Sequence, residues 1–257
     1  NYLKKIGLSK NDKFVCIINR DSNYKNFHSQ DKKDWSYHDH RNSDINNYRQ
    51  AAIELEKLGY WVLRMGVAMK GSFNCNSPKI IDYSKSRDRT DLLDLYLFSK
   101  CFFALGRDGG IICASYVSNV PCALVNVTNV VESPASNEKN LIIYKRFWHK
   151  KLSRYLTLEE IIINNFSNYY KKDDYDKNGI DLHENNNEEI AELAIEMHNR
   201  LNNAESYTNF ENELQKNFLS IFPKGNYYVK FRSRVGKKYL FRDHQLSKKY
   251  EFYKKNK

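Results

Sequence analysis

The sequence lacks any apolar run that approaches the ~18 residues of a membrane-spanning helix. Its start does not resemble a secretory signal, and because it opens at Asn1 rather than at a methionine we expect a truncated or processed chain. Glycine and proline are scarce, at 10 and 4 of 257 residues, whereas hydrophobic residues make up 41%. That content is enough to bury a core in one large domain or two small ones.

Cysteine spacing argues against metal and disulfide chemistry. The five cysteines form no C-x-x-C pair, and no H-x-x-x-H spacing accompanies them. All except Cys75 lie in apolar surroundings, where a reduced cysteine behaves as a small hydrophobic residue. We therefore expect a cytoplasmic protein with reduced core thiols at Cys16, Cys101, Cys113 and Cys122.

The net charge of +11 is concentrated at the carboxyl end. Residues 224–257 hold twelve Lys and Arg against two acids, so the rest of the chain is nearly neutral, which argues against nucleic acid as a partner of the fold. Basic residues interleaved with aromatic ones are typical of contact with an anionic leaflet, here the inner face of the membrane. A solvated end, or one that packs on a missing half of a larger protein, explains the same pattern. The aromatic residues are Tyr227, Tyr228, Phe231, Tyr239, Phe241, Tyr250, Phe252 and Tyr253.

Short apolar strands alternate with amphipathic helices up to about residue 126. Strands are predicted at residues 14–19, 61–65, 79–82, 102–105 and 121–125, and helices at 44–58, 90–100 and 111–118. This alternation predicts an α/β fold, a Rossmann-like parallel sheet of about five strands with helices on both faces. After residue 127 we expect only helices, at 157–165, 187–201 and 207–221. The predicted units are therefore residues 1–126, a helical completion at 127–223 and the basic tail at 224–257.

Polar residues follow each of the five predicted strands. Ligands bind at the carboxyl ends of the strands in open parallel sheets, and three of these five strand ends carry an arginine. Any strand end needs loop residues, but repeated arginine favours a site for an anionic ligand. The candidates for binding are Arg20, Arg64, Gly66, Asp82, Tyr83, Asp108, Gly109, Gly110 and Asn126, with Asp21 as a candidate catalytic residue.

The segment Gly106-Arg-Asp-Gly-Gly110 joins a predicted strand to a predicted helix. Adjacent glycines let the backbone approach an anion, and the N–H groups of a following helix point toward it, so the segment resembles a diphosphate-binding turn. It matches neither G-x-G-x-x-G nor the P-loop G-K-[ST], which argues against NAD and ATP chemistry. An ordinary tight turn is the alternative.

A second polar segment, His38-Asp-His-Arg-Asn42, precedes the first predicted helix. No cysteine or carboxylate partner for a metal is evident, so we favour His40 as a proton acceptor and Arg41 as a two-pronged phosphate donor, with Asn42 beside it. A solvated loop that caps the helix is the alternative.

Several segments, taken together and in order, resemble a family of bacterial glycosyltransferases from surface-polysaccharide loci. They are Tyr37-His-Asp-His-Arg-Asn-Ser-Asp44 with Tyr48, Gly59-Tyr-Trp-Val-Leu-Arg-Met-Gly66, Ile81-Asp-Tyr83, Asp94-Leu-Tyr-Leu97, Cys101-Phe-Phe103, Asp108-Gly-Gly110, Pro121, Val125-Asn126, Tyr144-Lys-Arg-Phe-Trp148, Leu156-Thr157, Asn185 to Ile190, and Glu196 to Leu201. The resemblance covers residues 13–202, and the family is similar to the carboxyl, donor-binding half of GT-B enzymes. In addition, Arg20 is similar to the arginine that contacts the donor phosphate in fucosyltransferase-like GT-B folds.

The resemblance implies sugar transfer from a nucleotide-sugar to an acceptor hydroxyl of a glycan or glycolipid, without a cofactor or an obligatory metal. On this interpretation Arg20, Arg41, Arg64 and the Asp108–Gly110 turn bind the diphosphate, Asp82 and Asn126 position the base or ribose, and His40 or Asp21 accepts the proton. The chain departs from the family in two ways: it lacks the amino-terminal acceptor half, and Asp108-Gly-Gly110 replaces a serine-containing turn. A nucleotide-sugar epimerase, or a non-catalytic binder of RNA or anionic surfaces, is the alternative function.

Overall fold

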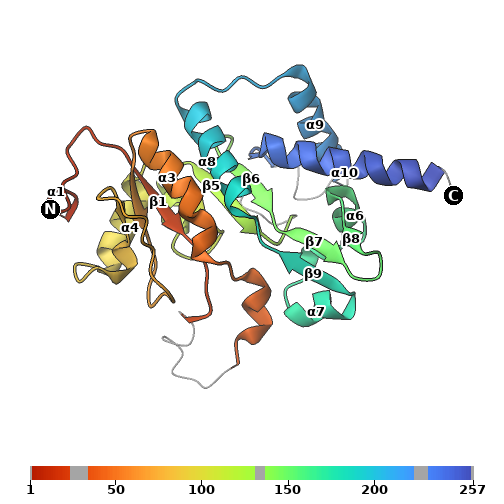
Figure 1. The fold of residues 1–257 in the computed structure, drawn as a ribbon, viewed down its shortest axis with the longest axis horizontal. Helices are drawn as coiled ribbons and strands as arrows, with labels where there is room; N and C mark the ends of the chain where they lie inside the picture. Colours follow the sequence, from red (N-terminus) through yellow and green to blue (C-terminus); the bar gives the residue numbers. More distant parts are fainter. Residues whose placement is uncertain (1, 24–33, 131–136, 223–230, 256–257) are drawn as a thin grey trace.

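The structure, a computed structural model, describes residues 2–23, 34–130, 137–222 and 231–255, with side chains of the last helix described to residue 250 (Figure 1). A seven-stranded parallel sheet forms its centre, in the order β10-β6-β5-β4-β1-β2-β3. Six of these strands have the 3-2-1-4-5-6 order of the dinucleotide-binding Rossmann fold. The strands are β1 (Phe14–Ile18), β2 (Trp61–Arg64), β3 (Ile80–Ile81), β4 (Phe103–Gly106), β5 (Cys122–Val127), β6 (Leu141–Tyr144) and β10 (Arg234–Val235).

Helices cover both faces of this sheet, as the sequence predicts. Parallel crossovers are right-handed, so the helix between β1 and β2 lies on the face opposite the helices between β3 and β5. On the first face α3 packs beside α8, which also contacts β5 and β6 (Figure 1). The elements are η1 (Ser36–Arg41), η2 (Ile45–Tyr48), α3 (Arg49–Lys57) and α8 (Asn187–Leu201) on one side, and η3 (Tyr83–Lys85), α4 (Asp91–Lys100) and α5 (Cys113–Val117) in the other crossovers.

Local signals place several of these boundaries. The Asp44 side chain accepts the Asn46 N–H at the start of η2, and Thr90 accepts the Leu93 N–H at the start of α4. Gly59 follows α3 at φ +93°, a backbone conformation that glycine adopts without steric cost. Helix α5 begins only at Cys113, and this cysteine is exposed, so its prediction as a core thiol is wrong. Cys16, Cys101 and Cys122 are buried as expected.

The expectation of helices alone after residue 127 is wrong. Strand β6 extends the main sheet, and β7 (Arg146–His149), β8 (Arg154–Tyr155) and β9 (Ile180–His183) form a second, antiparallel sheet in the order β8-β7-β9. These strands have two to four residues each, too few for a period-2 pattern to stand out. The helices here are α6 (Leu158–Ile163), η4 (Phe166–Asn168), α7 (Lys172–Lys177) and α9 (Asn209–Ser220), and α6, α8 and α9 each begin with a capping box.

The described part of the basic tail packs on the rest of the chain. Helix α10 (Lys237–Lys255) follows β10, and the short helix α1 (Tyr2–Lys5) lies at the other end of the chain. Tyr239 and Leu240 of α10 are buried, and Arg242 binds Glu192 of α8 at 2.8 Å. The tail's cations are therefore partly used within the fold. Tyr227 and Tyr228, and the side chains of Phe252 and Tyr253, lie outside the described residues.

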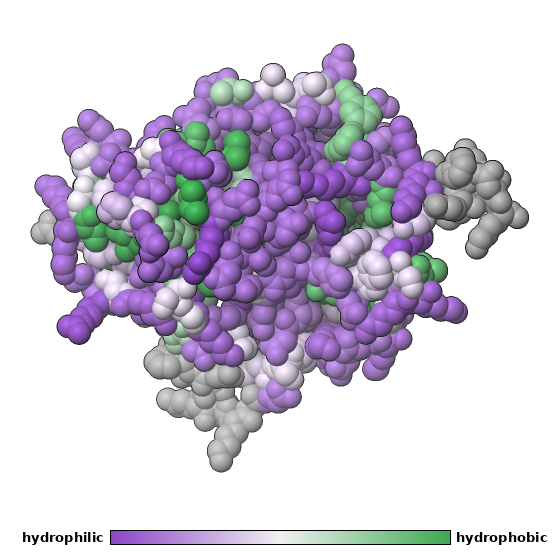
Figure 2. All heavy atoms as spheres, in the orientation of Figure 1, coloured by the Kyte–Doolittle hydropathy of each residue, from purple (hydrophilic) through white to green (hydrophobic). Residues whose placement is uncertain are grey.

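The surface in the view of Figure 2 is mostly hydrophilic, with apolar side chains in small separate groups. Among the described helices, none is long and apolar enough to cross a membrane.

Candidate functional site

The site lies where the strand order reverses, between the carboxyl ends of β1 and β4. The two strands approach closely here: a Cβ added to Gly106 would lie 2.1 Å from the Ile18 carbonyl oxygen. Only glycine fits at this position. The residues that follow, Arg20 and Arg107, are thereby brought to one edge of the sheet.

Arg107 is a deeply buried cation at this edge, with 4% of the residue exposed. Its Nη2 donates to Thr128 Oγ1 at 3.2 Å, and its Nη1 donates to the Asp108 carbonyl at 3.2 Å. The nearest carboxylate oxygen, Asp108 Oδ1, is 3.5 Å away. Its Nε has no hydrogen-bond partner among the described residues. Arg107 is one of the three arginines at the predicted strand ends, but only its neighbours, Asp108 to Gly110, were predicted as binding candidates.

Asn42 connects Arg20, which follows β1, to Lys145, a residue that was not among the predicted binding candidates. Arg20 donates to Asn42 Oδ1 and, at 3.2 Å, to the His38 carbonyl. Lys145, which directly follows β6, donates from Nζ to the Asn42 carbonyl at 2.6 Å. Because no strand was predicted at residues 141–144, nothing in the sequence pattern placed Lys145 at this edge.

Arg20, Arg41, Arg107 and Lys145 form what we call the basic cluster. Burial lowers the pKa of Arg107 to about 10; Asp108 opposes this shift, while Arg41 and Arg20 add to it. Burial likewise lowers the pKa of Lys145 to about 8, with Arg107 and Arg20 contributing and Glu184 opposing. The pKa of Arg20 is also lowered, mainly by burial and then by Arg41.

Within the described residues, no carboxylate lies within 4.0 Å of the charged nitrogens of Arg20, Arg41 or Lys145. These three cations are therefore held near others of the same sign without a close ionic partner, whereas Arg107 has Asp108 at 3.5 Å. A bound anion would relieve both the mutual repulsion and the cost of burial.

His40 lies beside the basic cluster with a neutral ring and an unprotonated Nε2. Its Nδ1 lies 3.1 Å from the Tyr37 carbonyl, which can only accept, so Nδ1 carries the hydrogen and Nε2 keeps its lone pair. Burial, followed by Arg107, Arg41 and His38, lowers the pKa of His40 to about 4 against the effect of the Tyr37 carbonyl. The ring is therefore neutral at pH 7. The Tyr175 ring packs against it at 5.3 Å.

Asp21, the other predicted proton acceptor, is held by backbone donors. Its Oδ1 accepts from Asn23 N and its Oδ2 from Lys70 N, each at 2.9 Å. These bonds tie the loop after β1 to the loop after β2, so both oxygens already have protein partners. Of the two predicted proton acceptors, we therefore favour His40, because its Nε2 keeps a lone pair while its Nδ1 binds the Tyr37 carbonyl.

The predicted residues after β2 and β3 form a separate group. Arg64 is fully buried and binds Asp82 at 3.0 Å, so each neutralises the other, and it also donates to Ser84 Oγ at 2.9 Å. Tyr83 is fully buried and packs edge-on against Tyr2 at 5.2 Å. Gly66 has φ +138°, and a Cβ there would lie 2.5 Å from the Met69 side chain. These contacts account for the four residues through folding alone, and their binding roles stay predictions.

Gly109 and Gly110 are exposed and face open space. Neither has a positive φ, and the five-residue α5 begins three residues beyond Gly110. The expected helix N-terminus is therefore not directly behind the turn, but the open space leaves room for a ligand beside Asp108.

Asn126 points into the fold rather than to solvent. It is fully buried with φ +57°, and it exchanges hydrogen bonds with Asn185: each backbone N–H donates to the other's Oδ1 at 2.7 Å. This pair joins the ends of β5 and β9. The structure thus brings Arg20, Arg41, Asn42, His40 and Asp108 together and places Asn126 behind them.

No family model, curated protein or solved structure matches this chain. Within the described ranges, no group of three His, Cys, Asp or Glu side chains is placed to hold a metal ion.

Proposed function

We propose that the basic cluster binds the diphosphate of a nucleotide-sugar and that the chain is the donor-binding part of a glycosyltransferase. The observation that carries this proposal is the convergence of four cations at the switch point of a Rossmann-ordered sheet, with the buried Arg107 Nε lacking a partner among the described residues. Switch points are where such sheets bind nucleotides. Rigid guanidinium groups suit phosphate oxygens because they donate two parallel hydrogen bonds.

The proposed reaction needs little beyond this arrangement and one base. The acceptor hydroxyl gives its proton to His40 Nε2 while its oxygen bonds to the anomeric carbon of the sugar. The bond from that carbon to the phosphate oxygen breaks, and the nucleoside diphosphate leaves with the electron pair. Arg20, Arg107 and Lys145 would stabilise the charge that develops on the leaving group. An acceptor, expected to be a glycan or glycolipid of a surface polysaccharide, would have to reach this edge of the sheet.

A thermal-shift panel tests the binding half of the proposal. UDP, GDP, CMP and ADP would each be added with and without EDTA, because a ligand at 100 times its Kd stabilises the folded state by about 2.7 kcal/mol. We expect one nucleoside diphosphate to raise the Tm, with the same shift in EDTA. If none of the four raises it, the nucleotide assignment is wrong, and if EDTA removes the shift, the metal-independent mechanism is wrong.

Turnover of the sugar conjugate of the nucleotide that binds then separates transfer from epimerisation. Release of the nucleoside diphosphate only when an acceptor is added supports a transferase, whereas conversion of the donor with no acceptor present supports the epimerase. The matched variant His40→Gln should keep nucleotide affinity and lose turnover, because the amide retains polarity at this position without a basic nitrogen.

A further inference from the structure

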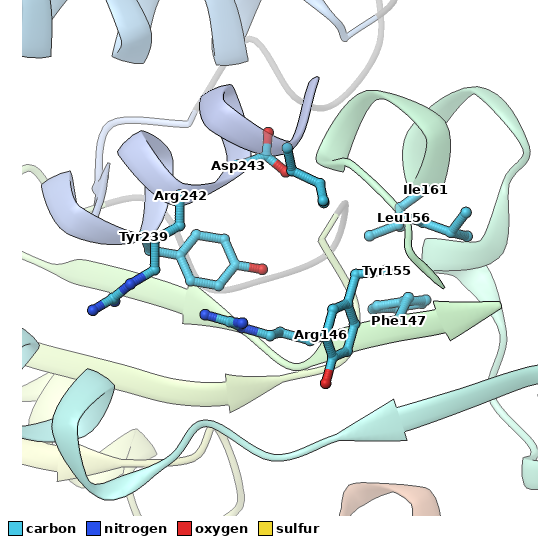
Figure 3. A pocket seen from close by; sticks show the side chains of 9 residues that line it. Arg146, Phe147, Tyr155, Leu156, Ile161, Tyr239, Arg242 and Asp243 are labelled. Atoms are coloured by element: carbon cyan, nitrogen blue, oxygen red, sulfur yellow. The ribbon is translucent and has the colours of Figure 1, made fainter. Parts of the chain in front are cut away.

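A second possible binding site lies on the small sheet, away from the switch point. A cavity of about 90 Å³ separates α10 from β7, β8 and α6 (Figure 3). Apolar and polar side chains both line it, so it has an amphipathic lining. The apolar side chains are Phe147, Leu156, Ile161 and Leu246, and the polar ones are Arg146, Tyr155, Tyr239, Arg242 and Asp243. We call this space the α10 cavity.

Two polar groups on α10 face the cavity with unused hydrogen-bonding capacity. The hydroxyl of Tyr239, a residue only 9% exposed, points into the cavity (Figure 3), and the described residues offer it no hydrogen-bond partner. Asp243 accepts the Leu158 N–H with Oδ1 at 2.9 Å, while its Oδ2 has no donor among the described residues. A hydroxyl-bearing molecule would satisfy both groups.

The two arginines that line the cavity already have acidic partners. Arg146 forms an ion pair with Glu189, and Arg242 binds Glu192 at 2.8 Å. In the part of the chain that the structure describes, neither Arg20 nor Lys145 of the basic cluster has such a partner. The α10 cavity is therefore suited to a neutral ligand rather than to another phosphate.

Three aromatic rings extend the cavity along the small sheet. Trp148 pairs with Tyr155 across β7 and β8, which places both side chains on one face, and the Trp148 ring packs edge-on against Tyr155 at 5.1 Å. The Trp148 and His183 ring planes are within 5° of parallel with centroids 6.2 Å apart, and the Tyr155 hydroxyl is 2.8 Å from His183 Nδ1. Trp148 and Tyr155 are partly exposed, and His183 is exposed. We call these three residues the ring shelf; its Tyr155 also lines the cavity.

We infer that the ring shelf and the α10 cavity together bind a neutral saccharide. A sugar ring offers apolar C–H groups on one face and hydroxyls around its rim, which match partly exposed aromatic rings beside the Tyr239 hydroxyl and the Asp243 carboxyl. The cavity is smaller than the ~150 Å³ of an engineered cavity that holds benzene, so it receives one substituent of the sugar while the shelf carries its ring. This inference does not rest on the proposed function, because it uses a different sheet and a ligand of different charge.

Saturation-transfer NMR on the full chain tests the inference. Its signal comes from the ligand protons, so replacing Trp148 does not remove the means of detection. Maltotriose and chitotriose are the saccharide probes, and adenosine is the planar, neutral comparison. We expect saturation transfer to the C–H protons of one face of a saccharide. In Trp148→Ala the Kd for that saccharide should be at least ~10-fold higher. Trp148→Phe, which keeps a ring, should stay within ~3-fold of the parent, and Tyr239→Phe should weaken binding because it removes only the hydroxyl.

Phe241→Ala is the matched control, because Phe241 is an exposed ring on α10 that does not line the cavity; its affinity should be unchanged. Saturating UDP should not displace the saccharide, which keeps failure here distinct from failure at the basic cluster. Transfer to adenosine but to neither saccharide would overturn the inference. So would equal affinity in the parent and in a folded Trp148→Ala chain, or a loss of affinity in Phe241→Ala as large as that in Trp148→Ala.

Discussion

Replacing Lys145 with methionine separates stability from binding at the basic cluster. Methionine keeps most of the apolar stem and removes the ammonium. Burial lowers the pKa of Lys145 from 10.5 to about 8, a difference that corresponds to roughly 3 kcal/mol against the charged form in the folded state. The substitution also leaves the Asn42 carbonyl without its donor, which costs ~1–3 kcal/mol. At pH 7 we therefore expect the free energy of unfolding to stay the same or to rise by up to ~2 kcal/mol.

The stability difference between Lys145→Met and the parent should depend on pH. Between pH 8 and 10.5 the folded parent has lost a proton that the unfolded chain still holds, so this group makes the parent more stable as pH rises. Lys145→Met lacks the effect. Its advantage over the parent, measured by urea unfolding, should therefore shrink between pH 7 and pH 10. Lys57→Met is the control, because Lys57 is exposed at the end of α3 and should show no such change.

The affinity for a nucleotide should fall in Lys145→Met, although the stability of the apo protein does not. Loss of one cation from the cluster should weaken the affinity for a nucleoside diphosphate by at least ~10-fold, or about 1.4 kcal/mol, while the apo protein is no less stable. A destabilisation of more than ~2 kcal/mol at pH 7, or an advantage that is the same at pH 7 and pH 10, would refute the reasoning that the ammonium is unfavourable without a ligand.

Three other predictions concern separate parts of the fold. Gly106→Ala should destabilise the chain by several kcal/mol or prevent folding, measured by urea unfolding, because its Cβ would overlap the Ile18 carbonyl; a stable variant would mean that β1 and β4 are farther apart. Gly110→Val, which meets open space, should leave the Tm within about 2 °C and weaken nucleotide binding at least ~10-fold; unchanged affinity would make residues 106–110 an ordinary turn. Burial raises the pKa of Glu196 and of Asp243 to about 7, so the folded chain keeps protons that the unfolded chain loses and these groups reduce stability as pH rises from about 5 to 7. The double variant Glu196→Gln, Asp243→Asn should therefore gain stability relative to the parent across this range, and a constant difference would contradict it.

The sequence predicted the sheet of residues 14–125 because each strand there has an apolar centre, and because Thr90 caps one predicted helix and Gly59 ends another. Strands β6 and β10 were missed because they are short and follow polar or basic segments. Their burial also depends on elements far away in sequence, since β6 packs on α8 and β10 pairs with β6. A two-residue strand such as Arg234–Val235 has no pattern of its own.

The candidate site was predicted in position but not in detail. The residues after β1 and the 38–42 segment do meet at one edge, since parallel strands share their carboxyl ends. Sequence alone could not show that Arg64 would be neutralised by Asp82, because that ion pair joins the ends of two different strands. Nor could it show that Arg107 would turn inward toward Thr128. Side-chain direction at a strand end is set by packing, which a strand pattern does not contain.

Calorimetric titration of the Arg107 variant tests the central claim most directly. The parent, Arg107→Gln and Arg49→Gln, an exposed arginine at the start of α3 that serves as control, would each be titrated with UDP, GDP and ADP in EDTA. A charged hydrogen bond contributes ~1.5–3 kcal/mol, so we expect the parent and Arg49→Gln to bind one nucleotide equally and Arg107→Gln to bind it at least ~10-fold more weakly. Equal affinity of Arg107→Gln and the parent, or no binding to the parent, would contradict a diphosphate site at this edge of the sheet.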